Sequence, residues 1–284
     1  MNRREEVVII AEETLAAFKR GSYTNADGAH VDVATPLAAC LDATREYDPD
    51  ELARIRDQVL ARQGSAATTF ALERETTLQG SARLVESGRY QRIAALNFAA
   101  ARQPGGGFLN GALAQEESLA RSSGLYFSLL KHPNFYEFHR VHDTSLYSDR
   151  MIYSPACPII RNDEGHWLPN PFAVDFITSA APNAEAVERN EPHNRTRIAP
   201  VLAERASKVL ALAAHRECDA LVLGAWGCGA FGNDSVMVAR VFYDLLRPDG
   251  LYGRYFQHVL FAIYTTQREQ INYNSFTKQF ASLI

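Results

Sequence analysis

Two neighbouring carboxylates stand shortly after a run of three glycines in the first half of the chain. The glycines are Gly105, Gly106 and Gly107, and the carboxylates are Glu116 and Glu117. Consecutive glycines and adjacent like charges both reduce stability, so we expect a function to maintain them. A carboxyl group can transfer protons to and from a substrate, and a glycine backbone can approach a charged ligand closely. The combination indicates acid–base chemistry on an anionic ligand.

The two glutamates are expected at the start of a helix over residues 117–130. Carboxylates at a helix N-terminus interact favourably with the helix dipole, so a purely structural role is one explanation. Because consecutive helix positions point in different directions, we expect each carboxyl group to have its own role. One would protonate a leaving oxygen, with a pKa raised by partial burial and the neighbouring charge, and the other would bind a sugar hydroxyl. The usual glycosidase differs, because its two carboxyl groups flank the scissile bond.

A second glycine-rich loop, GAWGCGAFGND at residues 224–234, follows later in the chain. Each glycine loop comes after a short apolar run that predicts a buried strand, at residues 93–98 and 219–226. Backbone N–H groups in strand-to-helix turns bind anions, and the helix dipole adds to the attraction. Two such loops in one sheet predict a ligand with a diphosphate, lying across the carboxyl ends of the strands.

Gly227, Gly229 and Gly232 also match the GxGxxG fingerprint of dinucleotide-binding proteins. In that fold the loop opens the first βα unit, and the next strand ends in an acidic residue. Here one further strand is expected, HVLFAIY at residues 258–264, and it ends without an acid. The sequence therefore favours a phosphate loop of another α/β fold, with a purely structural glycine turn as the alternative.

Some other residues could have a chemical role as well as a structural one. Cys228 could be a nucleophilic thiol at a helix N-terminus, but no histidine is near it in sequence, so a packing role is favoured. His132, His139 and His142 are close together in sequence, but no carboxylate or cysteine has the spacing of a metal site. We expect no metal ligands among them.

The segment EPHNRTR, residues 191–197, carries two arginines ahead of a predicted helix. Arg195 or Arg197 could bind a phosphate group, because a guanidinium donates paired hydrogen bonds to phosphate oxygens. A solvated start of the helix is the structural explanation, and we favour it.

The hydrophobic pattern predicts an α/β fold in which helices cover both faces of a sheet. Residues 1–65 are expected to form an α-rich extension, with a helix over Arg3–Arg20 ended by Gly21 and a hairpin around NADG. Residues 66–284 form the predicted core. Pro155 and Pro158 indicate a strand that is bulged or near an edge. Strands are predicted at 67–72, 93–98, 151–160, 172–180, 219–226 and 258–264, and helices at 50–62, 76–87, 117–130, 198–215, 234–246 and 272–283.

Composition restricts the class of protein. The 284 residues are 46% hydrophobic and 22% charged, as in ordinary globular proteins, and the net charge of −4 offers no basic field for nucleic acid. The four cysteines include no CxxC pair, which indicates free thiols in a cytoplasmic protein. Glutamates interrupt the apolar residues near the N-terminus, and no apolar run approaches 18 residues. We therefore expect neither a signal peptide nor a membrane span.

The glycine triplet and the sequence QEE at residues 115–117, with seven residues between them, resemble the signature of the poly(ADP-ribose) glycohydrolases. The stretch NFAAARQPGGGFLNGALAQEESLARSSGLY is similar to the bacterial-type branch in particular, as is GAWGCGAFGND. The resemblance implies a macrodomain-like three-layer α/β/α sandwich with an N-terminal extension. It also implies cleavage of the ribose–ribose O-glycosidic bond of poly(ADP-ribose), from the chain terminus, without a metal or redox cofactor.

The resemblance also assigns roles by position. Glu117 matches the catalytic acid/base, and Glu116 matches the glutamate that contacts the adjoining ribose. Asn97 is expected on the terminal ribose, and Phe231 is expected to pack against it. The remaining substrate-binding residues lie in the QEE sequence and the two glycine loops; they are Gln115, Gly105, Gly106, Gly107, Gly227, Gly229, Ala230 and Gly232.

The implied partners are poly(ADP-ribose), ADP-ribose and ADP-ribosylated proteins. We expect a monomer that binds neither DNA nor membranes. Two other functions stay open on the same scaffold. One is a hydrolase of mono-ADP-ribose on protein or nucleic acid, and the other is a non-catalytic ADP-ribose reader. The intact QEE sequence argues against the reader, because a pure binder of a polyanion has no need of two adjacent acids.

Overall fold

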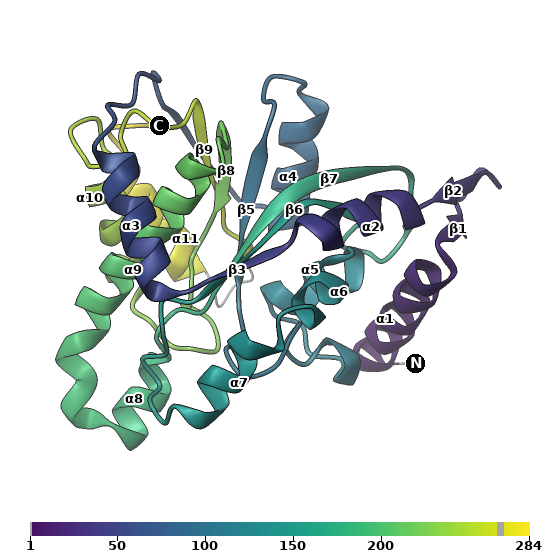
Figure 1. Cartoon of the computed structure of the whole chain (residues 1–284), viewed down its shortest axis with the longest axis horizontal. Coiled ribbons are helices and arrows are strands. Elements are labelled where there is room, and N and C mark those ends of the chain that lie inside the picture. Colours follow the sequence, from purple (N-terminus) through teal and green to yellow (C-terminus); the bar gives the residue numbers. More distant parts are fainter. Residues whose placement is uncertain (1, 266–269) are drawn as a thin grey trace.

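A seven-stranded mixed β-sheet forms the centre of the computed structural model, which describes residues 2–265 and 270–284 (Figure 1). The strand order is β3-β6-β7-β5-β8-β9-β4. The five strands from β7 to β4 run parallel, and β6 and β3 extend the sheet through antiparallel pairs. The strands are β3 (Arg45–Tyr47), β4 (Thr69–Glu73), β5 (Ile93–Phe98), β6 (Met151–Arg161), β7 (Trp167–Ser179), β8 (Ala220–Leu223) and β9 (His258–Ala262).

Helices cover both faces of the sheet, as predicted. One core cluster joins the sheet to α3, α9, α10 and α11, and the other joins it to α2, α4, α5, α6 and α7 (Figure 1). The helices are α1 (Arg3–Arg20), α2 (Ala34–Ala43), α3 (Pro49–Leu60), α4 (Thr77–Glu86), α5 (Gln115–Ser122), α6 (Leu125–Leu130), α7 (Pro133–Val141), α8 (Ala184–Asn190), α9 (Ile198–His215), α10 (Ser235–Leu246) and α11 (Gln270–Phe280). The three-layer α/β/α expectation is confirmed.

Most predicted elements lie where the hydrophobic pattern placed them. The first helix begins with a capping box between Asn2 and Glu5 and ends at Gly21, whose φ of 83° is left-handed. The hairpin around NADG is formed by β1 (Ser22–Thr24) and β2 (His30–Asp32). The short elements α2, β3, α7 and α8 were not predicted, because a few residues provide too little periodicity.

The helix predicted over residues 117–130 is instead two helices, so that prediction was wrong. Ser123 is extended, with φ −143° and ψ 175°, and forms an isolated bridge with Ile159 of β6. The N–H of Gly124 donates to Pro158 O at 2.9 Å. These contacts to a distant strand replace the hydrogen bonds that would have continued the helix.

The two prolines of β6 coincide with a bulge, as predicted. The register between β6 and β7 shifts between Ser154 and Cys157, and Ala156 has a φ of 44°. The N–H of Ala156 donates to the buried carboxylate of Asp175 on β7 at 2.7 Å. Only the short β3 lies outside β6 in the sheet. The strand with the bulge, β6, therefore lies close to the edge of the sheet, where irregular pairing is tolerated.

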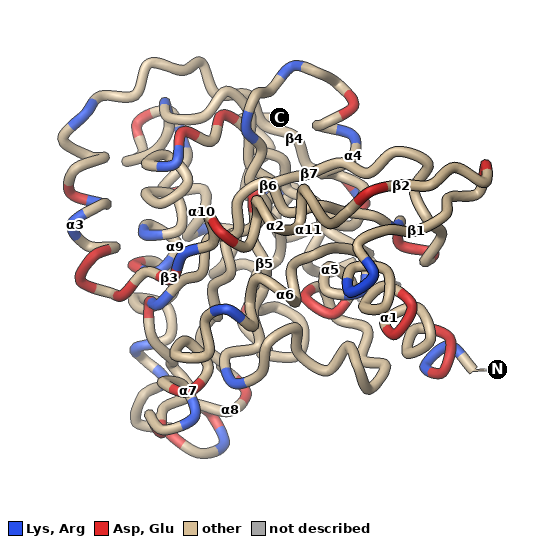
Figure 2. The backbone as a smooth tube through the Cα atoms, turned by 45° about the vertical axis from the view of Figure 1, so that its right-hand side comes forward, with Lys and Arg blue, Asp and Glu red and all other residues tan. Residues whose placement is uncertain are grey.

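The division at residue 65 stays a prediction, although the structure shows how the first 60 residues meet the rest. The edge strand β3 pairs with β6, and α3 packs against α9. Helix α1 lies beside α5 on the other side of the sheet (Figure 1). Figure 2 shows that both acidic and basic residues occur along α1 and α3. Among the described residues, no helix is both long and apolar enough to cross a bilayer.

Thr14 joins α1 to the rest of the molecule. Its hydroxyl is buried, donates to Arg121 O of α5 at 2.8 Å, and accepts from Arg161 Nε of β6 at 2.9 Å. Arg161 also donates to Glu13 at 2.7 Å and stacks on Trp167, 3.3 Å from the ring centroid. One hydroxyl therefore satisfies polar groups from two other elements.

We expect Thr14→Val to destabilise the fold by about 1–3 kcal/mol, because it leaves a buried carbonyl and a buried guanidinium N–H without this partner. Urea unfolding of the two proteins measures the difference. Thr14→Ser is the matched control and should stay within about 1 kcal/mol of wild type, because it keeps the hydroxyl. Equal losses in both variants would contradict the hydrogen-bonding argument.

Candidate active site

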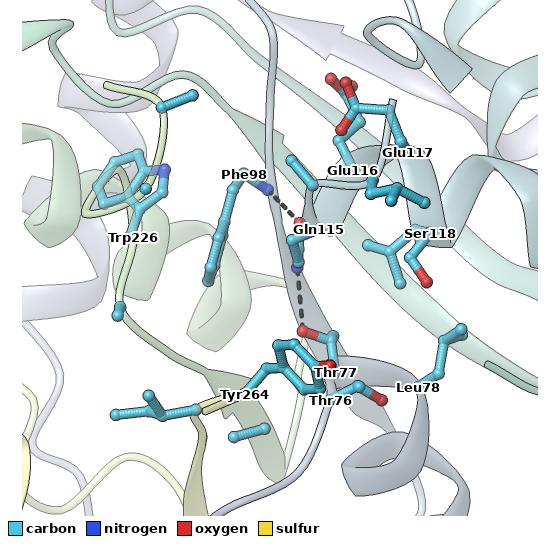
Figure 3. A pocket seen from close by; sticks show the side chains of 18 of the residues that line it. Thr76, Thr77, Leu78, Phe98, Gln115, Glu116, Glu117, Ser118, Trp226 and Tyr264 are labelled. Carbon is cyan, nitrogen blue, oxygen red and sulfur yellow. Dashed lines mark hydrogen bonds between the residues drawn. The ribbon is translucent and has the colours of Figure 1, made fainter. Parts of the chain in front are cut away.

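A cavity of about 720 Å³ opens at the carboxyl edge of the parallel strands. It lies between the start of α5 and the loop after β8, and Figure 3 shows Glu116 and Glu117 on one side and Trp226 on the other. Phe98 lies between them, and Tyr264 and Thr76 lie at another part of the wall. The two glutamates and the second glycine loop, predicted separately, line one cavity of a size typical of ligand sites.

Gln115 fastens the first turn of α5 to the end of β5. Its side-chain oxygen accepts from Phe98 N at 2.9 Å, and its Nε2 donates to Leu96 O at 2.8 Å and to Thr77 Oγ1 at 3.0 Å (Figure 3). These hydrogen bonds place the next two residues, Glu116 and Glu117, at the edge of the sheet. Both the oxygen and the nitrogen of the Gln115 side chain are bonded to other groups of the protein, so its observed role is to position α5.

Glu116 is almost fully buried behind the glycine loop, at 2% exposure. Its carboxyl oxygens accept from Asn97 Nδ2 at 3.2 Å and from Ala100 N at 2.7 Å. Burial raises the pKa of Glu116 to about 8, although these two hydrogen bonds act in the opposite direction. The neighbouring charge of Glu117 raises it further. At neutral pH, Glu116 is therefore mainly protonated.

Glu117 meets the glycine triplet directly. Its Oε1 accepts from Gly107 N at 2.9 Å, and Gly106 has a left-handed φ of 57°. A Cβ on Gly106 would lie only 2.8 Å from the Glu117 carboxyl carbon and 3.3 Å from Glu116 Oε2. Gly106 thus lets the backbone pass against both carboxyl groups, whereas a Cβ on Gly105 would meet Phe108 and a Cβ on Gly107 would meet Ala112. The expected contact of the glycine triplet with a diphosphate stays a prediction.

Asn97 lies in the middle of this network, fully buried on β5. Its Nδ2 donates to Glu116 and, at 3.1 Å, to Thr178 Oγ1 of β7. Its Oδ1 has no hydrogen-bond partner among the described residues. A buried acceptor without a partner is unfavourable unless a ligand or water satisfies it. Asn97 is not among the residues that line the cavity, so its expected contact with the terminal ribose stays a prediction.

The second glycine loop forms the opposite wall. Gly227 has a φ of 73°, and a Cβ there would lie 2.7 Å from Ala181 Cβ. Asn233 closes the loop by donating to Gly227 O at 3.1 Å. By contrast, a Cβ on Gly229 would meet no atom within 4 Å, and Gly229 lines the cavity with Ala230 and Phe231. Gly232 follows with a φ of 65°.

The other residues considered have structural explanations. Burial raises the pKa of Cys228 to about 12, so the thiol is not a ready nucleophile. His139 is buried, with Nδ1 on Phe135 O and Nε2 on Ser148, and burial lowers its pKa to about 4. Over residues 2–265 and 270–284, no three His, Cys, Asp or Glu side chains are grouped to hold a metal. All four cysteines are free thiols, as expected.

Sequence reasoning missed several residues of the cavity wall. Tyr264 lies two residues after the end of β9, lines the cavity and is 60% exposed, whereas the sequence predicted it as the last residue of that strand. Asp163 comes from the turn between β6 and β7 and accepts from Thr76 Oγ1 at 2.6 Å and Ser118 Oγ at 3.3 Å. Nothing near Asp163 in sequence indicated this position.

We expect Gly106→Ala to lower activity on the order of 100-fold, because the new methyl group would displace the Glu117 carboxyl group. It should also destabilise the fold by about 1–3 kcal/mol, since φ at this position is left-handed. Gly88→Ala is the control, because Gly88 has a φ of 62° but open space around it. If both variants keep full activity, the close approach of the glycine to the carboxyl group is unimportant.

The pKa of Glu116 predicts a pH dependence of stability. The folded protein keeps this proton up to about pH 8, whereas an unfolded glutamate loses it near 4.5. The stabilising contribution of the protonated group is thus complete below pH 4.5 and is lost as the pH rises through 8. In Glu116→Gln this loss should be absent, so wild type should weaken relative to the variant by up to about 1.4 kcal/mol per pH unit.

Urea unfolding of wild type and Glu116→Gln at pH 5, 6.5 and 8 measures this difference. Taking the difference between the two proteins removes the contributions of other titrating groups, such as His139. A constant difference across the three pH values would show that Glu116 titrates at its ordinary value.

Comparison with known proteins places this geometry in a family. The model of the microbial-type PARG catalytic domain matches residues 11–162. The X-ray structure of poly(ADP-ribose) glycohydrolase (PARG) from Thermomonospora curvata is 43% identical, with a TM-score of 0.93, covering 97% of this chain and 100% of that chain. The same enzyme bound to the inhibitor ADP-HPD has a TM-score of 0.90 at 43% identity, covering 97% of this chain and 100% of that chain.

A second bacterial enzyme is similar over most of the chain. The structure of PARG from Deinococcus radiodurans in complex with ADP-ribose is 42% identical, with a TM-score of 0.81, covering 87% of this chain and 97% of that chain. No curated protein matches the sequence. The family model and these structures agree with the fold and with the resemblance of the QEE and glycine motifs, and the chain belongs to the microbial-type poly(ADP-ribose) glycohydrolases.

Proposed function

We propose that the 720 Å³ cavity binds the terminal ADP-ribose unit of poly(ADP-ribose), with Glu117 as the catalytic acid/base and Glu116 as the ribose-binding group. The observation that carries this proposal is the pair of carboxyl groups held at the glycine triplet, one buried with a raised pKa and the other accepting from Gly107 N. Such a pair supplies both proton transfer and sugar binding on one side of the bond.

Glu117 performs the proton transfers in this mechanism. Its carboxyl proton passes to the leaving ribose oxygen as the C1″–O bond breaks, which leaves an oxocarbenium ion on the terminal ribose. The resulting carboxylate then accepts a proton from the water that attacks C1″, and this restores the acid. The substrate diphosphate lies close enough to the ribose to help stabilise the positive charge.

Glu116 supports this step by staying neutral. Because its pKa is about 8, it adds little negative charge beside Glu117 or beside the diphosphate of the substrate. Its hydrogen bonds to Asn97 Nδ2 and Ala100 N hold it in place while it binds a ribose hydroxyl. Once Glu117 has given up its proton, a second full charge at this position would repel the anionic polymer.

The remaining wall residues bind the rest of the unit. The loop of Gly227, Gly229 and Gly232 offers backbone N–H groups to the diphosphate, with Gly229 open to the cavity. Phe231 packs on the terminal ribose. Tyr264 is exposed at the rim and is suited to stacking on adenine.

The biological setting follows from this substrate. The enzyme acts as a cytoplasmic monomer on poly(ADP-ribose), including chains on ADP-ribosylated proteins. Cleavage from the chain terminus is supported by the residues at one end of the cavity, where Arg3 of α1 and Leu113 form part of the wall. An N-terminal extension that stands in the cavity wall favours a free chain end over an internal segment.

We expect Glu117→Gln to lower release of ADP-ribose from purified poly(ADP-ribose) by about 10²–10⁴-fold, because it removes the transferable proton. Mass-resolved chromatography measures the product, and EDTA is present throughout. The variant should still bind ADP-ribose, which isothermal titration tests.

Two results would redirect the assignment. If wild type binds ADP-ribose but releases none from the polymer, the site acts on mono-ADP-ribosyl substrates or as a reader. If Glu117→Gln keeps full activity, another group is the acid/base.

A further inference from the structure

A second cavity, of about 510 Å³, lies at the same edge of the sheet as the candidate active site. The chain segments that form it are residues 143–149, before β6, and residues 191–205, after α8. Because β6 runs antiparallel to β7, its start lies opposite the carboxyl end of β7, where α8 follows. The function proposed above does not use this cavity.

Two aromatic rings separate the cavities. Tyr147 lines the second cavity, and its ring centroid lies 5.8 Å from that of Phe231, which lines the first. Tyr147 has a left-handed φ of 56°, which is unfavourable for a bulky residue and persists where surrounding contacts enforce it. Its ring therefore stands beside the residue expected to pack on the terminal ribose, at the boundary of the two cavities.

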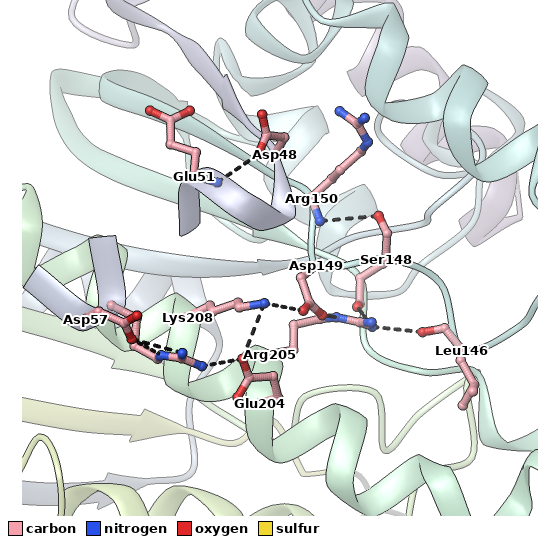
Figure 4. Close-up of polar contacts among 12 residues, drawn as sticks. Asp48, Glu51, Asp57, Leu146, Ser148, Asp149, Arg150, Glu204, Arg205 and Lys208 are labelled. Carbon is pink, nitrogen blue, oxygen red and sulfur yellow. Dashed lines mark hydrogen bonds and ion pairs between the residues drawn. The ribbon is translucent and has the colours of Figure 1, made fainter. Parts of the chain in front are cut away.

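Two of the three carboxylates that line the second cavity are held in place by other groups of the protein. Asp149 pairs with Arg205 at 2.9 Å and Lys208 at 2.6 Å (Figure 4). Glu191 accepts from Thr144 Oγ1 at 2.8 Å, from Ser145 N at 2.6 Å and from Asn194 Nδ2 at 2.8 Å. These two acids hold the walls together. The exposed Asp143 is the third carboxylate of the lining.

Arg197 is the cation of this cavity that is available to a ligand. Its Nη1 donates to Asn194 Oδ1 at 3.0 Å, and Asn194 is itself fixed by Glu191. Within the described part of the chain Arg197 forms no ion pair, whereas Arg195 pairs with Glu188 at 2.7 Å and lies outside the lining. His193 lies beside Arg197 in the wall. The hydrogen bond to Asn194 thus holds the Arg197 guanidinium in the wall of the cavity.

We propose that the second cavity binds the ADP-ribose unit on the leaving side of the scissile bond, with Arg197 contacting its diphosphate. This inference rests on the proposed function. With the terminal ribose between Glu117 and Phe231, the leaving oxygen belongs to the adenosine ribose of the next unit, and that unit continues past Tyr147. A nucleotide fits the mixed lining, because its phosphates suit Arg197 and its hydroxyl and amino donors suit Thr144, Ser148 and Asp143.

The experiment compares two substrates that share the terminal ADP-ribose. One is purified poly(ADP-ribose), and the other is ADP-ribose with a 4-nitrophenyl group on the 1″ oxygen, which has no adjoining unit. For Arg197→Ala we expect kcat/KM on the polymer to fall about tenfold, mainly through KM, because a charged hydrogen bond to the substrate is lost. On the aryl substrate kcat/KM should stay within about twofold, and Arg197→Lys should recover part of the loss.

Arg195→Ala is the matched control and should behave as wild type on both substrates, since it removes a nearby positive charge outside the cavity. Equal losses by Arg197→Ala on both substrates, or no loss on either, would overturn the subsite while the proposed function stands. Equal losses from Arg197→Ala and Arg195→Ala on the polymer would also overturn the subsite, because they would indicate only a non-specific attraction between positive charge and the anionic polymer. If wild type hydrolyses neither substrate while Glu117→Gln matches it, the proposed function fails as well.

Discussion

The attachment of the first turn of α5 to the end of β5 is the constraint on which the rest of the site depends. Gln115 bonds the backbone of Phe98 and Leu96, and Glu116 bonds the backbone of Ala100. The loop between β5 and α5 must therefore leave the end of the strand and return to it within a short distance. Only a residue without a side chain can pass the two carboxyl groups at that point, which explains Gly106.

The attachment of α5 to β5 also brings two carboxyl groups together, and the raised pKa of Glu116 reduces the repulsion between them. Two ionised carboxyl groups on adjacent residues would repel each other and an anionic substrate. Burial resolves the conflict by keeping one group neutral, while Gly107 N stabilises the position of the other. The arrangement keeps two chemically distinct carboxyl groups together.

Residues from the N-terminal part of the chain and from the loops at the carboxyl edge of the sheet line the active-site cavity. Helix α1 is held to α5 through Thr14, so its Arg3 reaches the cavity wall. On another side, the pair of Tyr147 and Phe231 separates the two cavities. The cavity is therefore lined by the N-terminal helix as well as by the loops that follow the parallel strands.

The sequence by itself determined the alternation of strands and helices, the two glycine loops and the QEE pair, because each depends on residues close together in the chain. Only the tertiary structure decided that α5 stops at Ser123, where a bridge to Ile159 replaces helical hydrogen bonds. It also decided that Glu116 is the carboxyl group with a raised pKa, because burial depends on Asn97 and the returning loop. The position of Asp163 could not be predicted, since its partners Thr76 and Ser118 are far from it in the chain.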